Sequence, residues 1–207
     1  MQFNDEINEL ENMNIESDFI ILKGDVPILF SAPHTMLQKR EDGTLKYNES
    51  YTKAILLYLN KHFKTYAIIK NNDTGIDSNR DNYDKYNVEL RRLIKEHNIK
   101  LVIDLHGASK ERDFDVEFGT LNNLSADFST IKELEEAFIE NGITNISHNS
   151  PFKGGFITQG IFGLTDVDVI QLEVNGRFRD SNNLDLLNKL IKSLEIFIKQ
   201  YNAYINR

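Results

Sequence analysis

Short apolar runs alternate along this chain with longer segments in which apolar residues recur at helical spacing. Runs rich in Ile, Val and Phe predict β-strands, which fall at 19–23, 27–31, 66–70, 100–105, 114–121 and 167–174. The helical spacing predicts helices over 51–63, 88–97, 131–141 and 184–204. Residues 1–18 form a polar lead-in with room for one short helix.

This order of elements predicts an α/β fold. Strands separated by helices pair mainly in parallel, because a helical connection returns the chain to the same end of the sheet. We therefore expect three layers, with helices on both faces of a mainly parallel, mixed sheet. No internal repeat or low-complexity linker divides the sequence, so residues 1–207 are expected to form a single domain. In such sheets, ligands bind outside the carboxyl ends of the strands.

Composition narrows the classes of function. The chain has 207 residues and a formal net charge of −8, with acidic and basic residues mixed along its length. Nucleic-acid binding requires clustered Lys and Arg, so no nucleic-acid partner is expected. The first residues do not resemble a targeting signal, and no apolar run reaches the length of a membrane span. We therefore expect a cytoplasmic protein without a membrane partner.

The sequence contains no Cys, which leaves His, Asp and Glu as the side chains able to ligate a metal ion. His34 follows the strand at 27–31, and His106 follows the strand at 100–105. His34 alone is best explained as the cap of a turn, but the two together are better explained as metal ligands. Two neutral imidazoles and one carboxylate bind Zn²⁺ and leave one position open for water.

Other polar residues at strand ends complete a candidate hydrolytic site. Glu173 lies in an otherwise apolar run and is the candidate general base, with a pairing to a nearby arginine as the alternative. Asp104, close to His106, is a candidate for orienting that imidazole, or else caps the following turn. Arg80 has a planar guanidinium that matches a substrate carboxylate, unless it pairs only with a neighbouring Asp.

Five short motifs, taken in order, resemble the N-formylglutamate amidohydrolase family. They are SAPH at 31–34, DSNR at 77–80, DLHGAS at 104–109, PFKGGFITQ at 151–159 and QLEVNGRFR at 171–179. The resemblance covers about residues 26–180. The family is similar in fold to zinc carboxypeptidases and to the aspartoacylase and succinylglutamate desuccinylase group. Those enzymes hydrolyse an amide next to a carboxylate-bearing amino acid and use one zinc ion, so the resemblance implies a zinc-carboxypeptidase-like fold.

The resemblance also implies a metal site. His34 and His106 match the family's two histidine ligands. In the carboxypeptidase and aspartoacylase groups, the carboxylate ligand lies three residues after the first histidine, where this chain has Leu37. The third ligand must then come from elsewhere, and Glu49 is the preferred candidate, with Asp77 as the alternative.

For catalysis, Glu173 matches the glutamate of the QLE motif. The resemblance implies that substrate is bound by Asn79 and Arg80, which match an Asn-Arg pair, and by Gly154 and Gly155 of the GG loop; Arg177 is a further candidate for binding the substrate carboxylate. Two departures from the family concern the substrate: Gln159 stands where many family members carry Arg, and the chain is short for the named enzyme.

These features predict a zinc-dependent amidohydrolase whose small-molecule substrate carries a carboxylate. A small N-acyl amino acid or a γ-glutamyl-type amide fits this description. Two alternatives stay open. One is a non-catalytic protein that binds an acidic metabolite on the same scaffold, which Leu37 motivates. The other is a metal phosphoesterase, which is weaker because the chain lacks a carboxylate-rich cluster for a second ion.

Overall fold

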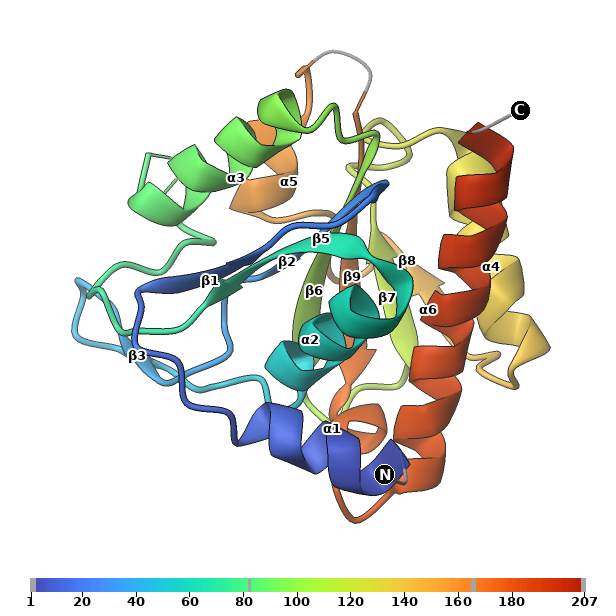
Figure 1. Ribbon diagram of the computed structural model, residues 1–207, viewed down its shortest axis with the longest axis horizontal. Coiled ribbons are helices and arrows are strands. Elements are labelled where there is room, and N and C mark those ends of the chain that lie inside the picture. Colours follow the sequence, from blue (N-terminus) through green and yellow to red (C-terminus); the bar gives the residue numbers. More distant parts are fainter. Residues whose placement is uncertain (1–2, 82, 165–166, 206–207) are drawn as a thin grey trace.

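The structure, a computed structural model, describes residues 3–81, 83–164 and 167–205. A seven-stranded sheet with the order β1-β5-β2-β6-β9-β7-β8 forms its centre, and a separate hairpin pairs β3 with β4 (Figure 1). The strands are β1 (Phe19–Leu22), β2 (Val26–Ala32), β3 (Gln38–Lys39), β4 (Leu45–Lys46), β5 (Thr65–Lys70), β6 (Leu101–Ala108), β7 (Val116–Gly119), β8 (Ile146–His148) and β9 (Asp168–Asn175). The helices are α1 (Phe3–Glu11), α2 (Thr52–Phe63), α3 (Lys85–Glu96), α4 (Phe128–Glu140), α5 (Phe156–Ile161), α6 (Leu184–Ile205) and the 3-10 helix η1 (Gly176–Arg179).

The sheet is mixed and mainly parallel, as predicted. Strands β5, β2, β6 and β9 run parallel to one another. Strand β1 is antiparallel to β5, β7 is antiparallel to β9, and β8 pairs in parallel with β7. The carboxyl ends of the four central strands therefore meet at one edge of the sheet, where a ligand site is expected.

Alternate side chains of the central strands enter two cores, one on each face of the sheet. Ile28 and Phe30 of β2 pack into the larger core together with α1, α2, α4 and α6. Leu29 packs on the opposite face with α3 and α5. Figure 1 shows these two groups of helices on opposite sides of the sheet, which confirms the three-layer α/β fold. Because side chains alternate along β2, the next side chain after Leu29 on the α3/α5 face is Ser31, so this face becomes polar towards the end of the strand.

Several element boundaries differ from the prediction. The strand predicted at 100–105 continues to Ala108, so His106 lies inside β6 and not after it. The prediction that each histidine follows a strand is correct only for His34, which lies two residues beyond β2. The sequence pattern did not indicate β3, β4, β8 or α5, which are only two to six residues long. Elements of this length are too short to show a periodicity.

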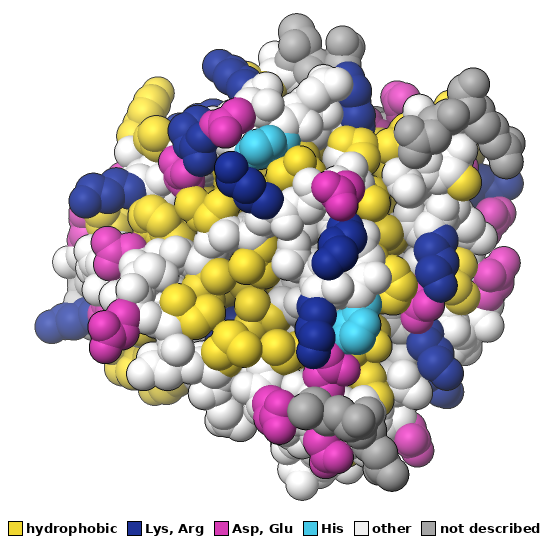
Figure 2. Space-filling model, in the orientation of Figure 1, with side chains coloured by type: hydrophobic (Ala, Val, Ile, Leu, Met, Phe, Trp, Pro, Cys, Tyr) yellow, Lys and Arg dark blue, Asp and Glu magenta, His cyan; other side chains and the backbone are white. Residues whose placement is uncertain are grey.

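Charged side chains are mixed on the surface. On the face shown in Figure 2, Lys and Arg side chains lie interspersed with Asp and Glu. Within the part of the chain that the structure describes, no helix combines the length and the apolar character needed to cross a membrane.

Candidate active site

Strand register brings the polar residues of the α3/α5 face together. His106 on β6 is the Cα partner of Glu173 on β9, and Glu173 is in turn the partner of Glu117 on β7. In the next row, Asp104 on β6 is the partner of Gln171 on β9. Partnered residues project from the same face of a sheet, and all five are buried. The sheet therefore carries a compact group of ionisable side chains near its carboxyl edge.

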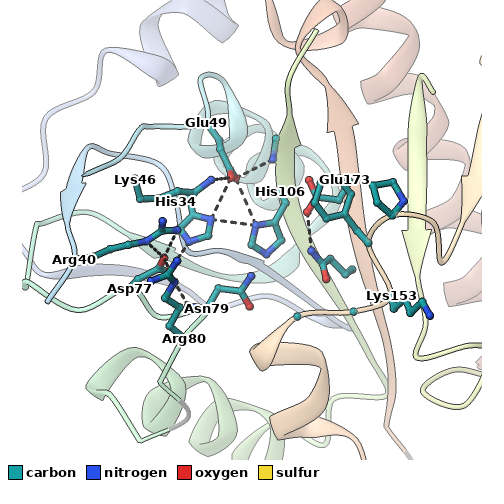
Figure 3. A pocket seen from close by; sticks show the side chains of 16 residues that line it. His34, Arg40, Lys46, Glu49, Asp77, Asn79, Arg80, His106, Lys153 and Glu173 are labelled. Carbon is teal, nitrogen blue, oxygen red and sulfur yellow. Dashed lines mark hydrogen bonds and ion pairs between the residues drawn. The ribbon is translucent and has the colours of Figure 1, made fainter. Parts of the chain in front are cut away.

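Three candidate ligand atoms converge beside this group (Figure 3). Nδ1 of His34 lies 3.2 Å from Nδ1 of His106 and 3.1 Å from Oε1 of Glu49. Nδ1 of His106 lies 3.6 Å from Oε2 of Glu49. Of the His, Asp and Glu side chains that the structure describes, these three form the one group compact enough to hold a metal ion. The structure thus brings together the two predicted histidines and the preferred third ligand.

A buried carboxylate holds the second nitrogen of each imidazole. Nε2 of His34 lies 2.7 Å from Oδ1 of Asp77, and Nε2 of His106 lies 2.9 Å from Oδ2 of Asp104. An ionised carboxylate only accepts hydrogen bonds, so each Nε2 carries the hydrogen, and in a neutral ring each Nδ1 presents a lone pair. Together with the Glu49 carboxylate, three acceptors then face one another in a buried site. Such an arrangement is stable only with a positive charge among the acceptors, which a proton on an imidazole or a bound metal ion supplies, so the residues present fit a metal ion.

The spacing and the electrostatics of the cluster agree with this fit. Ligand atoms about 2.0–2.1 Å from a tetrahedral zinc ion lie roughly 3.3 Å from one another. The two Nδ1 atoms here lie 3.2 Å apart, and Nδ1 of His34 and Nδ1 of His106 lie 3.1 and 3.6 Å from different oxygens of the Glu49 carboxylate. Burial would raise the pKa of Glu49, but His34 and His106 outweigh burial and hold this pKa well below its usual range. Burial would lower the pKa of His106, but Asp104 and Glu49 raise it well above its usual value. The cluster therefore strongly favours positive charge.

Contacts on several sides fix Glu49 in place. Its Oε2 accepts a hydrogen bond from the backbone N–H of Gly107 at 2.8 Å, and its Oε1 accepts one from Nζ of Lys46 at 2.6 Å. The backbone N–H of Glu49 donates to the carbonyl oxygen of His34 at 2.8 Å. The segment after the β3–β4 hairpin, which carries Glu49, therefore packs against the segment after β2, which carries His34. This contact brings both candidate ligands to His106 on β6, which is distant from them in sequence.

Glu173 lies beside the cluster on the neighbouring strand. It is 5% exposed, and its Oε1 accepts a hydrogen bond from Nε2 of Gln171 at 2.7 Å. Burial raises the pKa of Glu173 above its ordinary value, while the positive charge of His106 opposes this effect. A buried carboxyl with a raised pKa is suited to accept a proton and to return it.

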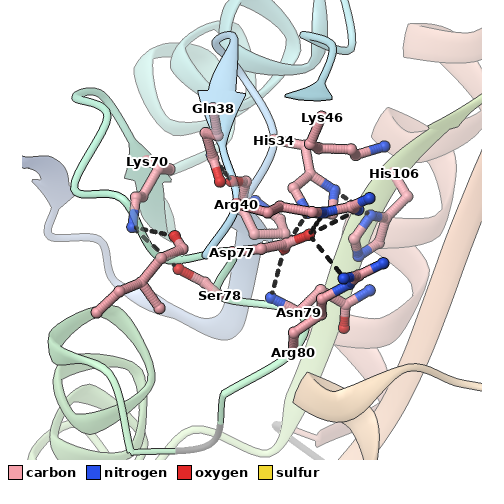
Figure 4. Close-up of polar contacts among 12 residues, drawn as sticks. His34, Gln38, Arg40, Lys46, Lys70, Asp77, Ser78, Asn79, Arg80 and His106 are labelled. Atoms are coloured by element: carbon pink, nitrogen blue, oxygen red, sulfur yellow. Dashed lines mark hydrogen bonds and ion pairs between the residues drawn. The ribbon is translucent and has the colours of Figure 1, made fainter. Parts of the chain in front are cut away.

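Asp77, the alternative third ligand, lies on the other side of His34 from Glu49 (Figure 3). Figure 4 shows the polar contacts around Asp77. Besides Nε2 of His34, it accepts hydrogen bonds from Nε of Arg40 at 2.8 Å and from the backbone N–H of Asn79 at 3.0 Å. Burial would raise the pKa of Asp77, but His34 and Arg40 hold it far below its usual range. The structure therefore gives Asp77 the geometry of a residue that orients His34.

The segment between β5 and α3 carries Asn79 and Arg80 to the same cavity. Lys70, which is fully buried, anchors this segment by donating to Oγ of Ser78 at 3.2 Å. The Arg80 side chain is 51% exposed, and its Nη1 lies 3.0 Å from Oδ2 of Asp42, which is equally exposed. An ion pair this exposed contributes little, and the second pair of Arg80, from Nε to Oδ2 of the buried Asp77, is long at 3.9 Å, so the guanidinium remains available to a ligand.

Gly154 and Gly155 line the same cavity as the candidate metal ligands. Gly154 has a φ of 109°, a conformation that favours glycine. A Cβ atom at Gly155 would collide with the side-chain amide of Asn79, so glycine lets the backbone lie against that residue. The cavity has a volume of about 350 Å³, and its lining includes both glycines, the three candidate ligands and Glu173.

The structure does not bring Arg177 to this cavity. Strand β9 ends at Asn175, and η1 then directs Arg177 towards Asp115, with Nη2 and Oδ1 2.9 Å apart. The predicted role of Arg177 in binding a carboxylate therefore gains no structural support. Three cations that the sequence did not single out line the cavity instead: Arg40, Lys46 and Lys153. Among 24 Lys and Arg residues, Arg40 and Lys46 lie in no distinguishing motif, and Lys153 lies in the PFKGGFITQ motif but was assigned no role there.

The fold and the clustered ligands define a three-layer α/β protein with a candidate single-metal hydrolytic site. Residues 59–178 match the model of the N-formylglutamate amidohydrolase family, and the chain belongs to this family. Hydrolysis of an amide bond is the chemistry that this membership supports. No match was found among curated proteins.

Solved structures share the fold at low sequence identity. N-formylglutamate amidohydrolase from Ralstonia eutropha JMP134 has a TM-score of 0.62 and 13% identity, covering 92% of this chain and 98% of that one. A bacteriophage poly-γ-glutamate hydrolase has a TM-score of 0.58 and 13% identity, covering 97% and 96%. A metallo-carboxypeptidase from Burkholderia cenocepacia has a TM-score of 0.51 and 14% identity, covering 88% of this chain and 61% of that one. These likenesses confirm the predicted carboxypeptidase-like α/β fold.

Proposed function

We propose that this protein is a zinc-dependent amidohydrolase whose substrate is a small N-acyl amino acid or a γ-glutamyl-type amide that carries a carboxylate. One observation supports this most directly. His106 and Glu173, register partners on adjacent strands, line one cavity together with His34 and Glu49. That combination provides three metal ligands and a proton carrier, which metal-assisted amide hydrolysis requires.

In this proposal, Nδ1 of His34, Nδ1 of His106 and the Glu49 carboxylate hold the zinc ion. A bound ion would polarise the amide carbonyl and lower the pKa of a water molecule. Glu173 takes a proton from the attacking water and gives it to the leaving nitrogen, which departs as an amine. Asp104 keeps the imidazole hydrogen of His106 on Nε2, and Asp77 does the same for His34. Nδ1 of each histidine then stays free to bind the ion.

The proposed substrate carboxylate binds to Arg80 and Asn79. A guanidinium forms two parallel hydrogen bonds to a carboxylate, and the exposed Asp42 is a weak competitor. The backbone at Gly154 and Gly155 lies across the cavity, where it can approach the acyl group. The bacteriophage neighbour, which nearly matches this chain in extent, motivates γ-glutamyl amides as probes beside N-acylglutamates.

The test combines metal analysis with an amine-release assay. Purified protein is expected to bind about one zinc ion per chain and to release glutamate from N-formylglutamate, N-acetylglutamate or a γ-glutamyl peptide. A folded protein that neither retains zinc nor releases amine after zinc addition contradicts the proposal. The alternative, a non-catalytic binding protein, predicts calorimetric binding of N-acylglutamates without any release of amine.

A further inference from the structure

The side chain of Tyr86 is fully buried between α3 and the sheet. Its hydroxyl oxygen accepts a hydrogen bond from the backbone N–H of Ala32 at 3.0 Å. The same oxygen lies 2.9 Å from Oγ of Ser31 and 3.0 Å from the carbonyl oxygen of Ile68. One phenol therefore connects helix α3 to both β2 and β5.

The hydrogen bonds continue from Ser31 to a candidate metal ligand. Oγ of Ser31 donates to Oδ1 of Asp104 at 2.8 Å, and Oδ2 of Asp104 accepts from Nε2 of His106 at 2.9 Å. The single hydroxyl hydrogen of Ser31 goes to the carboxylate, which has none to donate, so Oγ of Ser31 can only accept from Tyr86, and it shares the single hydroxyl hydrogen of Tyr86 with the carbonyl oxygen of Ile68. These four side chains are at most 2% exposed, so water does not compete for these bonds.

Tyr86 also acts on the segment that leads to the other histidine. Ala32 is the last residue of β2, and His34 follows two residues later. Because the hydroxyl of Tyr86 binds the N–H of Ala32, helix α3 fixes the end of this strand. The same hydroxyl is thus linked to His34 through the backbone and to His106 through Ser31 and Asp104.

We propose that Tyr86 and Ser31 are positioning residues that set the affinity of the His34–Glu49–His106 cluster for its metal ion, an inference that rests on the proposed zinc site. A carboxylate held at one oxygen alone can rotate away from the imidazole it orients. Ser31 fixes the second oxygen of Asp104, and Tyr86 fixes the hydroxyl of Ser31. Partners that orient a metal-bound histidine typically change metal affinity by about 10–100-fold when removed.

Two conservative variants test this inference. Tyr86→Phe removes only the hydroxyl and keeps the ring in the core, while Ser31→Ala breaks the link to Asp104. With zinc affinity measured by competition against a chromophoric chelator, we expect Ser31→Ala to weaken binding roughly 10-fold and Tyr86→Phe a few-fold. The double variant should lose less than the product of the two single losses, because the residues act in series. Tyr201→Phe removes the hydroxyl of a buried tyrosine on α6 and should leave zinc affinity unchanged.

Zinc affinities of Tyr86→Phe and Ser31→Ala equal to that of the parent protein would overturn the inference, as would purely multiplicative losses. A second readout uses the metal-free protein, in which the imidazole Nε2–H of His106 gives an NMR signal shifted downfield by Asp104. Ser31→Ala should move this signal towards the position of a free imidazole, and an unmoved signal also contradicts the inference. Zinc binding that depends on Ser31, without any amide hydrolysis, would refute the proposed function and leave this inference standing.

Discussion

Glu173 and His106 are Cα partners on adjacent parallel strands, so the backbone hydrogen bonds of the sheet fix their relative position. Both side chains are buried at the same level of the α3/α5 face. A proton carrier held by a strand is more precisely placed than one held by a loop, because the ladder restricts both backbones. The other two candidate ligands, His34 and Glu49, lie in connecting segments beside His106.

Replacing the proposed proton carrier should abolish most turnover without removing the metal. Glu173→Gln keeps the shape of the side chain but cannot accept the proton of water, so we expect kcat to fall by about 10²–10⁴. Zinc content should stay near that of the parent protein. Glu117→Gln is the matched control, because this partner on the far side of Glu173 can still accept the backbone N–H of Phe152. An unchanged kcat in Glu173→Gln would contradict the assigned role.

The pH dependence follows from the environment of the same residue. Burial raises the pKa of Glu173 above the ordinary glutamate value of 4.5. The residue must be ionised to accept a proton, so kcat/KM should fall as the pH is lowered through this raised pKa. The acidic limb of the profile is therefore expected to have its midpoint above 4.5. A midpoint at or below that value would show that Glu173 is not the group that titrates.

The identity of the third ligand can be tested by comparing two carboxylates. Glu49→Ala removes a group that faces Nδ1 of both imidazoles, so zinc affinity should fall by at least about 100-fold. Asp77→Ala removes a partner of Nε2 of His34, and the expected loss is the smaller 10–100-fold typical of an orienting residue. The same chelator competition measures both variants. A larger loss in Asp77→Ala would reverse the assignment.

Substrate carboxylate binding should depend on Arg80 and not on Arg177. A charge-assisted hydrogen bond contributes about 1.5–3 kcal/mol, so Arg80→Ala should raise KM roughly 10- to 100-fold with a smaller change in kcat. The effect should vanish for a substrate analogue in which a carboxamide replaces the carboxylate. Arg177→Ala is the control, because this side chain pairs with Asp115 outside the cavity. Equal effects of the two variants would refute the assignment of Arg80.

Candidate residues that lie on, or next to, strongly patterned strands could be predicted from the sequence. The apolar runs that became β2, β6 and β9 located His34, His106 and Glu173, because few residues other than functional ones interrupt such runs. The sequence did not place His106 inside β6, because Gly107 and Ala108 are equally typical of the start of a loop. Strand ends are set by neighbouring strands, which a single sequence does not show.

The remainder of the site depends on tertiary contacts that leave no local pattern. Glu49 was preferred among the available carboxylates, but only the closure of its segment onto His34 and Gly107 brings it to the imidazoles. Tyr86 has the helical spacing of an ordinary core residue, and its sequence context does not reveal that its hydroxyl reaches β2. The sequence predicts a role in substrate binding for Arg177, but η1 directs this side chain towards Asp115.

The most direct test of the account is an anomalous difference map from crystals grown with zinc and measured at the zinc absorption edge. We predict one peak per chain, bounded by Nδ1 of His34, Nδ1 of His106 and the carboxylate of Glu49. The absence of a peak at this position in folded protein, or a peak at Nε2 of His34 beside Asp77, would contradict the central claim.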